Sequence, residues 1–304
     1  MPLRPTPRPN ATLICESRDM VGESPVWDER TGSLIWIDII GKRIHRLQLA
    51  SQTHDVWTTP DFVTGIGLCH DGGAIVGLLK EVCLWDFAEG WQTLAQVEPD
   101  LPENRLNECG VAPDGSFWVA TMRNNFDASG HPIETVERSG TYYRVDPAGN
   151  VRRLTDDVYG ITNTLAWTDD GRFLTADTTA NQIFSYPYDC AAQALGQRTP
   201  FAIPFERGLP DGSCLDAEGY LWNCRVGGGA CLVRYAPDGL VDRVVDLPCS
   251  WPTSCTFGGE NLDTLFVTSA RFTMTPEHLQ HHPQEGDLWV VNVGVGGRPC
   301  HRFG

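Results

Sequence analysis

Four oxygen-bearing side chains precede a turn glycine by nearly the same number of residues. Asp211 lies eight residues before Gly219, and the same spacing recurs in two other segments and, with one extra residue, in a third. The residues at this position are Glu23, Asn107, Asn163 and Asp211. Carboxylate and carboxamide oxygens are the ligands that hard divalent cations prefer. Brought to one point, they would form a metal site with positions left open for water and a substrate.

A purely local role for Asp211 competes with this interpretation. Asp211 follows Pro210 and precedes Gly212, and Pro-Asp-Gly is an ordinary turn signal in which the aspartate bonds its own backbone. Turn capping would account for Asp and Asn at this position. It accounts less well for Glu23, because glutamate is a poorer turn former, and we therefore favour the metal site.

Further polar residues are expected around these ligands. Arg105 lies two residues before Asn107, so the two side chains point to the same side of an extended strand. Its guanidinium suits carboxylate or polyol oxygens. Asn125 follows the next strand and is expected to contact a substrate. Glu108 is expected to face away from the site and to be structural.

The elements that must position these residues are short strands in a repeat. A turn containing Gly or Asp, followed by an apolar, aromatic-rich strand, occurs six times, and each copy is followed by a second strand-turn-strand stretch. The turn residues that mark the copies are Gly32, Gly72, Gly115, Gly171, Gly219 and Asp263. Four short strands in each period of ~40–50 residues are typical of a β-propeller blade. The sequence therefore predicts an all-β, six-bladed β-propeller, in one domain over residues 1–304.

In a propeller the innermost strands run along the central channel, so equivalent positions of different blades face one another there. In the second and sixth copies the site position falls on Thr64 and Cys255. The strand predicted at 11–15 is expected to pair near 286–293 and close the ring, because an open propeller would expose two sheet edges. Residues 123–140 form an insertion over one face of the ring, with a purely decorative loop as the alternative.

Several motifs resemble the senescence marker protein/gluconolactonase/luciferin-regenerating enzyme family. They are GESPVW, NRLNECGVAPDGSFWVATM, ITNTLAWTDDGRF, GLPDGSCLDAEGYLW and SCTFGGENLDTLFVTSAR, and the resemblance covers about residues 13 to 293. It implies a six-bladed propeller that binds one divalent metal cation in its central channel and hydrolyses a sugar lactone. The identity of the cation stays open among Ca²⁺, Mn²⁺, Zn²⁺ and Fe²⁺.

The resemblance also implies roles for individual residues. Glu23, Asn163 and Asp211 would be the protein ligands of the metal, and Asp211 would double as the general base. Asn107 would lie beside the metal and Arg105 on substrate hydroxyls. The chain departs from the family pattern at two positions. It has Asn125 where some members have an acidic residue, and Glu108 where Asp often follows the asparagine of the third blade.

The expected chemistry needs little beyond these groups. A metal would polarise the lactone carbonyl, Asp211 would help to deprotonate water, and the ring would open to the aldonic acid. The chain lacks GxSxG, HExxH, GxGxxG and P-loop motifs, so no other chemistry is indicated. The alternatives are another metal-dependent ester or phosphotriester hydrolase, a non-catalytic calcium-binding regulatory propeller, and a scaffold that binds proteins on its rim.

Composition restricts the partners and the compartment. The net charge of −16 argues against nucleic acids and anionic membranes as partners, because both need a basic surface. No apolar run approaches the roughly 20 residues of a membrane span, and the first 17 residues show no apolar leader. The 11 cysteines include no CxxC pair. We therefore expect a cytoplasmic protein that acts on a small molecule.

Overall fold

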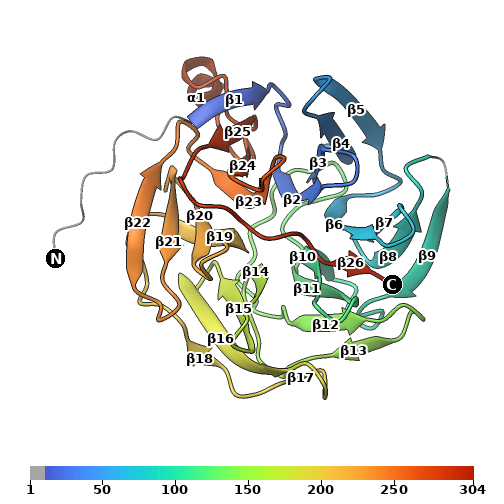
Figure 1. Ribbon diagram of the computed structural model, residues 1–304. Coiled ribbons are helices and arrows are strands. Elements are labelled where there is room, and N and C mark those ends of the chain that lie inside the picture. Colours follow the sequence, from blue (N-terminus) through green and yellow to red (C-terminus); the bar gives the residue numbers. More distant parts are fainter. Residues whose placement is uncertain (1–10, 89) are drawn as a thin grey trace.

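The computed structural model describes residues 11–88 and 90–304 and forms six small antiparallel sheets arranged as blades around a central axis (Figure 1). The predicted six-bladed β-propeller is confirmed. Residues 1–10, most of the segment in which no apolar leader was found, lie outside the described residues. No helix in the described part of the chain is long and apolar enough to cross a membrane.

The first three blades follow one another along the chain. Blade 1 consists of β2 (Gly22–Asp28), β3 (Ser33–Asp38), β4 (Arg43–Gln48) and β5 (Thr53–Thr58). Blade 2 consists of β6 (Val63–Cys69), β7 (Ala74–Leu78), β8 (Glu81–Trp85) and β9 (Trp91–Gln96). Blade 3 consists of β10 (Asn104–Val111), β11 (Phe117–Arg123), β12 (Tyr142–Val145) and β13 (Val151–Arg153).

The remaining blades complete the ring. Blade 4 consists of β14 (Thr162–Trp167), β15 (Arg172–Asp177) and β16 (Gln182–Asp189), with β17 (Ala194–Leu195) and β18 (Thr199–Pro200) both paired to β16. Blade 5 consists of β19 (Leu209–Leu215), β20 (Leu221–Val226), β21 (Cys231–Tyr235) and β22 (Val241–Asp246). Blade 6 consists of β23 (Pro252–Gly258), β24 (Thr264–Ser269), β25 (Leu288–Val291) and β1 (Ala11–Cys15).

The ring closes through strands from the two ends of the chain. β1 pairs antiparallel with β25 as the outermost strand of blade 6, as predicted, with Ala11 opposite Val291. The inner strands β2, β6, β10, β14, β19 and β23 each contact the next one round the ring. Closure leaves no first or last blade with an uncovered sheet face.

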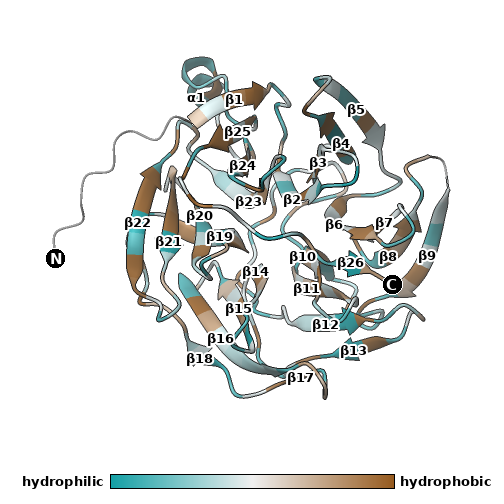
Figure 2. Cartoon of the chain, viewed as in Figure 1, coloured by the Kyte–Doolittle hydropathy of each residue, from teal (hydrophilic) through white to brown (hydrophobic). Residues whose placement is uncertain are grey.

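Turn glycines and aromatic contacts explain why the repeat folds in this way. Gly72, for example, has a φ of +99° in the turn between β6 and β7, a conformation that residues with a Cβ rarely adopt. Between the blades, Trp27 stacks on Phe266 at 5.7 Å, and Trp118 meets Trp167 edge-on at 5.3 Å. Trp27, Trp118 and Trp167 thus pack blade against blade, and Figure 2 shows hydrophobic colour on many of the strands.

The C-terminal segment crosses one face of the ring from blade 6 to blade 2 (Figure 1). Its last strand, β26 (Arg302–Phe303), pairs in parallel with β6. Arg302 donates to Asp28 at 2.6 Å, and the backbone N–H of Gly304 donates to the carbonyl of Gly115. These partners lie at the turns that follow the inner strands, so this segment covers the face on which those strands end.

A short helix, α1 (Pro276–His281), occupies the connection between β24 and β25. It contains no buried residue and is hydrophilic in Figure 2. The histidines of this segment therefore lie in a solvent-facing connection, where His278 Nε2 is 3.2 Å from Glu285 Oε1.

Candidate active site

A cavity of about 380 Å³ lies on the face of the ring where the inner strands begin. The structure brings every predicted site residue to its lining, which includes Glu23, Arg105, Asn107, Asn125, Asn163 and Asp211. The other lining residues come from loops on the same face, including Pro132 and Ile133 of the 123–140 insertion. The insertion thus helps to form the cavity, and the C-terminal segment closes the opposite face.

A β-bulge interrupts the inner strand of each blade close to the predicted site position. The ladder of β19 and β20 shifts between Pro210 and Ser213, which brackets Asp211, and the corresponding shift in β10 lies between Leu106 and Cys109. A bulge sets two residues against one on the partner strand, breaks the alternation of side chains and re-aims them. The bulges therefore supply the local geometry that turns these side chains toward the channel.

The bulge in blade 6 corrects one prediction. The sequence offset placed Cys255 at the site position, but the ladder of β23 and β24 shifts between Pro252 and Cys255. By comparison with blade 5, Thr253 is the counterpart of Asp211, and Thr253 lines the cavity whereas Cys255 does not. The turn residue that marks this copy, Asp263, lies ten residues after Thr253 rather than eight, so counting back eight residues ended two residues too late.

Blade 2 contributes no ligand to the cavity. Thr64 lies at the bulge of β6, as predicted, but it does not line the cavity. Its hydroxyl lies within hydrogen-bonding distance of the carbonyls of Gly77 and Leu78, at 3.2 and 3.3 Å. The side chain is therefore used inside its own blade.

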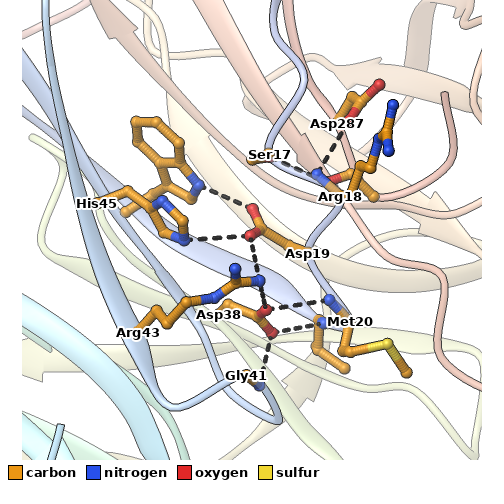
Figure 3. A network of polar contacts seen from close by, with 12 residues as sticks. Ser17, Arg18, Asp19, Met20, Asp38, Gly41, Arg43, His45 and Asp287 are labelled. Atoms are coloured by element: carbon orange, nitrogen blue, oxygen red, sulfur yellow. Dashed lines mark hydrogen bonds and ion pairs between the residues drawn. The ribbon is translucent and has the colours of Figure 1, made fainter. Parts of the chain in front are cut away.

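A polar network fixes the segment that leads into β2 and so positions Glu23 (Figure 3). The buried carboxylate of Asp38 accepts hydrogen bonds from the backbone N–H groups of Met20 and Val21, at 3.2 and 3.0 Å. The guanidinium of Arg43 lies 2.7 Å from the same carboxylate. The chain is thereby held two residues before Glu23.

Asp19 anchors the same segment to the interior of blade 1 (Figure 3). Its carboxylate accepts a hydrogen bond from the indole N–H of Trp36 at 2.9 Å and lies 3.1 Å from Nε2 of His45. Its backbone N–H donates to the carbonyl of Gly286 in blade 6. Because both blades hold this segment, ring closure itself helps to place Glu23.

Hydrogen bonds also fix the amide of Asn163. Its Nδ2 donates to the hydroxyl of Thr178 at 2.7 Å, and its Oδ1 accepts from Nδ2 of Asn107 at 3.3 Å. The hydroxyl of Thr178 in turn donates to the carbonyl of Pro210 at 2.8 Å. Asn163 therefore presents its oxygen, rather than its nitrogen, toward the other site residues.

Arg105 is buried beneath the cavity rather than extended into it. Its side chain donates to Oδ1 of Asn107 at 2.7 Å, to Oδ1 of Asn125 at 2.9 Å and to the carbonyl of Leu106 at 2.8 Å. The guanidinium also lies over the ring of Phe126, 4.8 Å from its centroid. Arg105 thus orients both asparagines, and Asn125 keeps its amide nitrogen without a partner among the described residues.

The carboxyl groups of the site lie in a poorly solvated environment. Burial raises the pKa of Glu23 to about 7. Burial, followed by repulsion from the Glu23 and Glu108 carboxylates, raises the pKa of Asp211 well above its ordinary range. Burial also lowers the pKa of Arg105 to about 9. The site therefore concentrates negative charge that its own buried cation offsets only in part.

Glu108 belongs to this charge cluster. It does not line the cavity, as expected for a side chain turned away from it. Its carboxyl is nevertheless buried, and burial together with the charge of Glu23 raises its pKa. If side chains alternated strictly along β10, Glu108 would point away from Asn107 and from the proposed ligands. The bulge at Asn107 and Glu108 removes that alternation.

The donor set suits a hard divalent cation. No group of three or more His, Cys, Asp or Glu side chains within residues 11–88 and 90–304 is arranged to hold a metal, so the carboxamide of Asn163 is essential to the candidate set. The Asp211 carboxylate accepts no hydrogen bond from the described residues. A cation bound by Glu23, Asn163 and Asp211 would offset the repulsion between the two carboxylates and satisfy these oxygens.

Comparisons with known proteins cover nearly the whole chain. Residues 21–271 match the family model described as SMP-30/Gluconolactonase/LRE-like region. The chain is 34% identical to the 6-deoxy-6-sulfogluconolactonase of Pseudomonas putida, over 95% of this chain and 97% of that protein. It is 32% identical to the regucalcin of Gallus gallus, with the same coverage. A solved structure of a calcium-binding protein, regucalcin, from Agrobacterium tumefaciens superposes with a TM-score of 0.86 at 27% identity, covering 96% of this chain and 97% of that one.

Proposed function

Because the chain belongs to the SMP-30/Gluconolactonase/LRE-like family, we propose that it hydrolyses a sugar lactone to the corresponding aldonic acid with one divalent cation. The observation that carries this proposal is the convergence of the buried oxygen donors Glu23, Asn163 and Asp211 on one cavity. The similarity to a sulfogluconolactonase supports a lactone as the substrate.

The proposed cation is held by Glu23, Asn163 and Asp211. When bound, it would polarise the lactone carbonyl as a Lewis acid. Similarity to regucalcins and to a calcium-binding protein supports a divalent cation, with Ca²⁺ as the first candidate beside Mn²⁺, Zn²⁺ and Fe²⁺.

Asp211 is the proposed general base. Its carboxylate is free of hydrogen bonds from the described residues, and burial raises its pKa, which makes it a stronger proton acceptor than an ordinary aspartate. As the water oxygen bonds to the carbonyl carbon, Asp211 takes the proton. The bond between that carbon and the ring oxygen then breaks, and the proton passes to the ring oxygen, giving the hydroxy acid.

Asn107, Asn125 and Arg105 are the proposed substrate-positioning residues. Asn125 has a free amide N–H for a substrate oxygen, and Arg105 fixes the orientation of both asparagines. Alignment of the carbonyl with the attacking water lowers the entropic part of the barrier.

The test is lactone hydrolysis by metal-stripped protein, followed with a pH indicator while Ca²⁺, Mn²⁺, Zn²⁺ and Fe²⁺ are added back separately. Hydrolysis should require a cation, and Asp211→Asn should lower kcat by a factor on the order of 10² to 10⁴, the usual effect of a general base. Asp238→Asn is the matched control, because Asp238 is an exposed turn residue outside the cavity. Hydrolysis that depends on neither the cation nor Asp211 would place the active site elsewhere.

A non-catalytic calcium-binding protein is the second candidate, favoured by the similarity to regucalcins. Calcium binding by calorimetry without turnover of any lactone would select it. Turnover of aryl esters or phosphotriesters, but of no lactone, would instead indicate another metal-dependent hydrolase. We also propose a cytoplasmic location, because all eleven cysteines are free thiols, as is usual in a reducing compartment.

A further inference from the structure

The walls of the cavity differ chemically from its floor. The floor carries the buried polar residues, among them Glu23, Asn163 and Asp211, of which none is more than 8% exposed. The walls are hydrophobic and come from four of the six blades and the loops that join them: Ile40, Ile133, Leu209, Val226, Trp251 and Phe272. A ligand that reaches the floor is therefore surrounded by apolar side chains above it.

Two of these wall residues expose an unusual amount of apolar surface. Ile133 is 46% exposed and Leu209 is 37% exposed. Single exposed hydrophobic residues are common on protein surfaces. These two line the same cavity with four other hydrophobic side chains, and such contiguous apolar surface is typical of a binding site. A bound apolar group would remove this surface from water.

Two of the three threonine hydroxyl groups in the lining are committed to the protein. Thr178 donates to the carbonyl of Pro210 at 2.8 Å, and Thr253 donates to the carbonyl of Gly22. The amide N–H of Asn125 and the hydroxyl of the exposed Thr273 are the side-chain donors left near the walls for a substrate. Hydroxyl groups far from the lactone carbonyl would thus lose water without gaining comparable partners, which is unfavourable.

The cavity also has no free positive charge among the described residues. Arg105 is the one cation in its lining, and its guanidinium already donates to Asn107, Asn125 and a backbone carbonyl. With the proposed metal ion on the floor of the cavity, an anionic substituent at the far end of the substrate would lie among apolar wall side chains and find no free side-chain cation. The cavity therefore disfavours sulfonate, carboxylate and phosphate groups on the substrate.

From these observations we propose that the substrate is a neutral lactone with an apolar end: polar at the carbonyl and the adjacent ring positions, and without hydroxyl or charged groups at the far end of its carbon chain. A deoxy or alkyl-substituted sugar lactone has this character, and a fully hydroxylated aldonolactone does not. The proposal rests on the lactonase function proposed above. A volume of about 380 Å³ accommodates a lactone ring with a substituent.

The test compares matched lactones with the metal-loaded protein. L-Rhamnono-1,4-lactone differs from L-mannono-1,4-lactone by the loss of one terminal hydroxyl, and it should be hydrolysed with a kcat/KM on the order of tenfold higher, since an unpaired buried hydroxyl is costly. In the series of 5-alkyl δ-lactones from methyl to pentyl, kcat/KM should rise by about fourfold for each methylene that is buried. 6-Phosphoglucono-1,5-lactone should be the poorest substrate.

Wall variants link the preference to the cavity. Ile133→Asn and Leu209→Asn change partly exposed positions that tolerate a polar side chain. Each variant should lower the ratio of kcat/KM for L-rhamnono-1,4-lactone to kcat/KM for L-mannono-1,4-lactone by about fourfold, because the hydroxylated lactone is least affected. Leu240→Asn is the matched control, because Leu240 is 61% exposed and lies outside the cavity. An unchanged ratio in both wall variants would contradict the proposal that these walls cause the preference for an apolar substrate.

The outcomes distinguish this proposal from the lactonase function itself. Metal- and Asp211-dependent hydrolysis that is equal or faster for the hydroxylated or phosphorylated lactones overturns the apolar preference and leaves the lactonase function standing. Absence of hydrolysis across the whole panel overturns both.

Discussion

Removal of the divalent cation is predicted to make the stability of the protein depend on pH through Glu23. Burial raises the pKa of Glu23 from 4.5 to about 7 in the folded protein. The folded state thus binds the proton more tightly than the unfolded state does. The associated stability is fully present below about pH 4.5 and is lost as the pH rises through about 7. The difference between the two pKa values corresponds to ~3 kcal/mol at most, or roughly 5–10 °C in Tm for a domain of this size.

The assay is thermal and urea unfolding in a chelator at about pH 5, 6, 7 and 8, repeated with saturating Ca²⁺. The metal-free protein should lose stability along this series, and the cation should remove most of the loss by stabilising the carboxylates. Glu23→Gln should reduce the pH dependence of the metal-free protein, and the raised pKa values of Asp211 and Glu108 account for the part that remains. Glu260→Gln, at an exposed turn position, should keep it.

Two results would refute this reasoning. One is a metal-free protein that is as stable at about pH 8 as at about pH 5. The other is a Glu23→Gln variant that retains the full pH dependence, because another group would then be responsible for it.

Three further predictions concern Asn125, the packing between blades and the closure of the ring. Asn125→Ala should lower kcat/KM for lactones on the order of tenfold by removing a substrate hydrogen bond. Asn125→Asp should keep the contact with Arg105 but lacks the amide N–H. Steady-state kinetics should therefore show a loss of kcat/KM in both variants, and wild-type kcat/KM in Asn125→Asp would show that the amide N–H does not matter. Trp27→Ala should destabilise the fold by about 3–5 kcal/mol because its stack on Phe266 joins blades 1 and 6, and a urea midpoint equal to that of the wild type would contradict this packing role. Deletion of residues 1–15 removes β1 and should leave β25 with an open edge, so the truncated chain should aggregate or melt at a clearly lower temperature, as light scattering and circular dichroism can show.

Much of the architecture could be predicted from local patterns. The turn glycines need positive φ values wherever the chain reverses, so their spacing reports the blades directly. β1 was recognisable as the closing strand because an open ring would expose edges. One cavity is lined by the four residues that share the offset, Glu23, Asn107, Asn163 and Asp211. They meet there because equivalent inner strands face the same channel.

Counting along the chain failed where the backbone departs from regular pairing. Cys255 was assigned to the site position because the turn residue Asp263 was taken to follow that position by eight residues, whereas the ladder of β23 and β24 gives it to Thr253, ten residues before Asp263. Glu108 joined the acidic cluster through a bulge that no local signal located. Bulges depend on how neighbouring strands meet in the closed ring, which is a tertiary property.

The sequence by itself therefore determined the number of blades, the closing strand and the types of side chain at the centre, because turn chemistry and strand alternation act over a few residues. The tertiary structure alone decided which atoms of those side chains face one another, which loops supply the hydrophobic walls such as Ile133 and Leu209, and that the C-terminal segment covers the opposite face. These features join residues far apart in the chain, and their positions follow from packing within the closed ring rather than from any local preference.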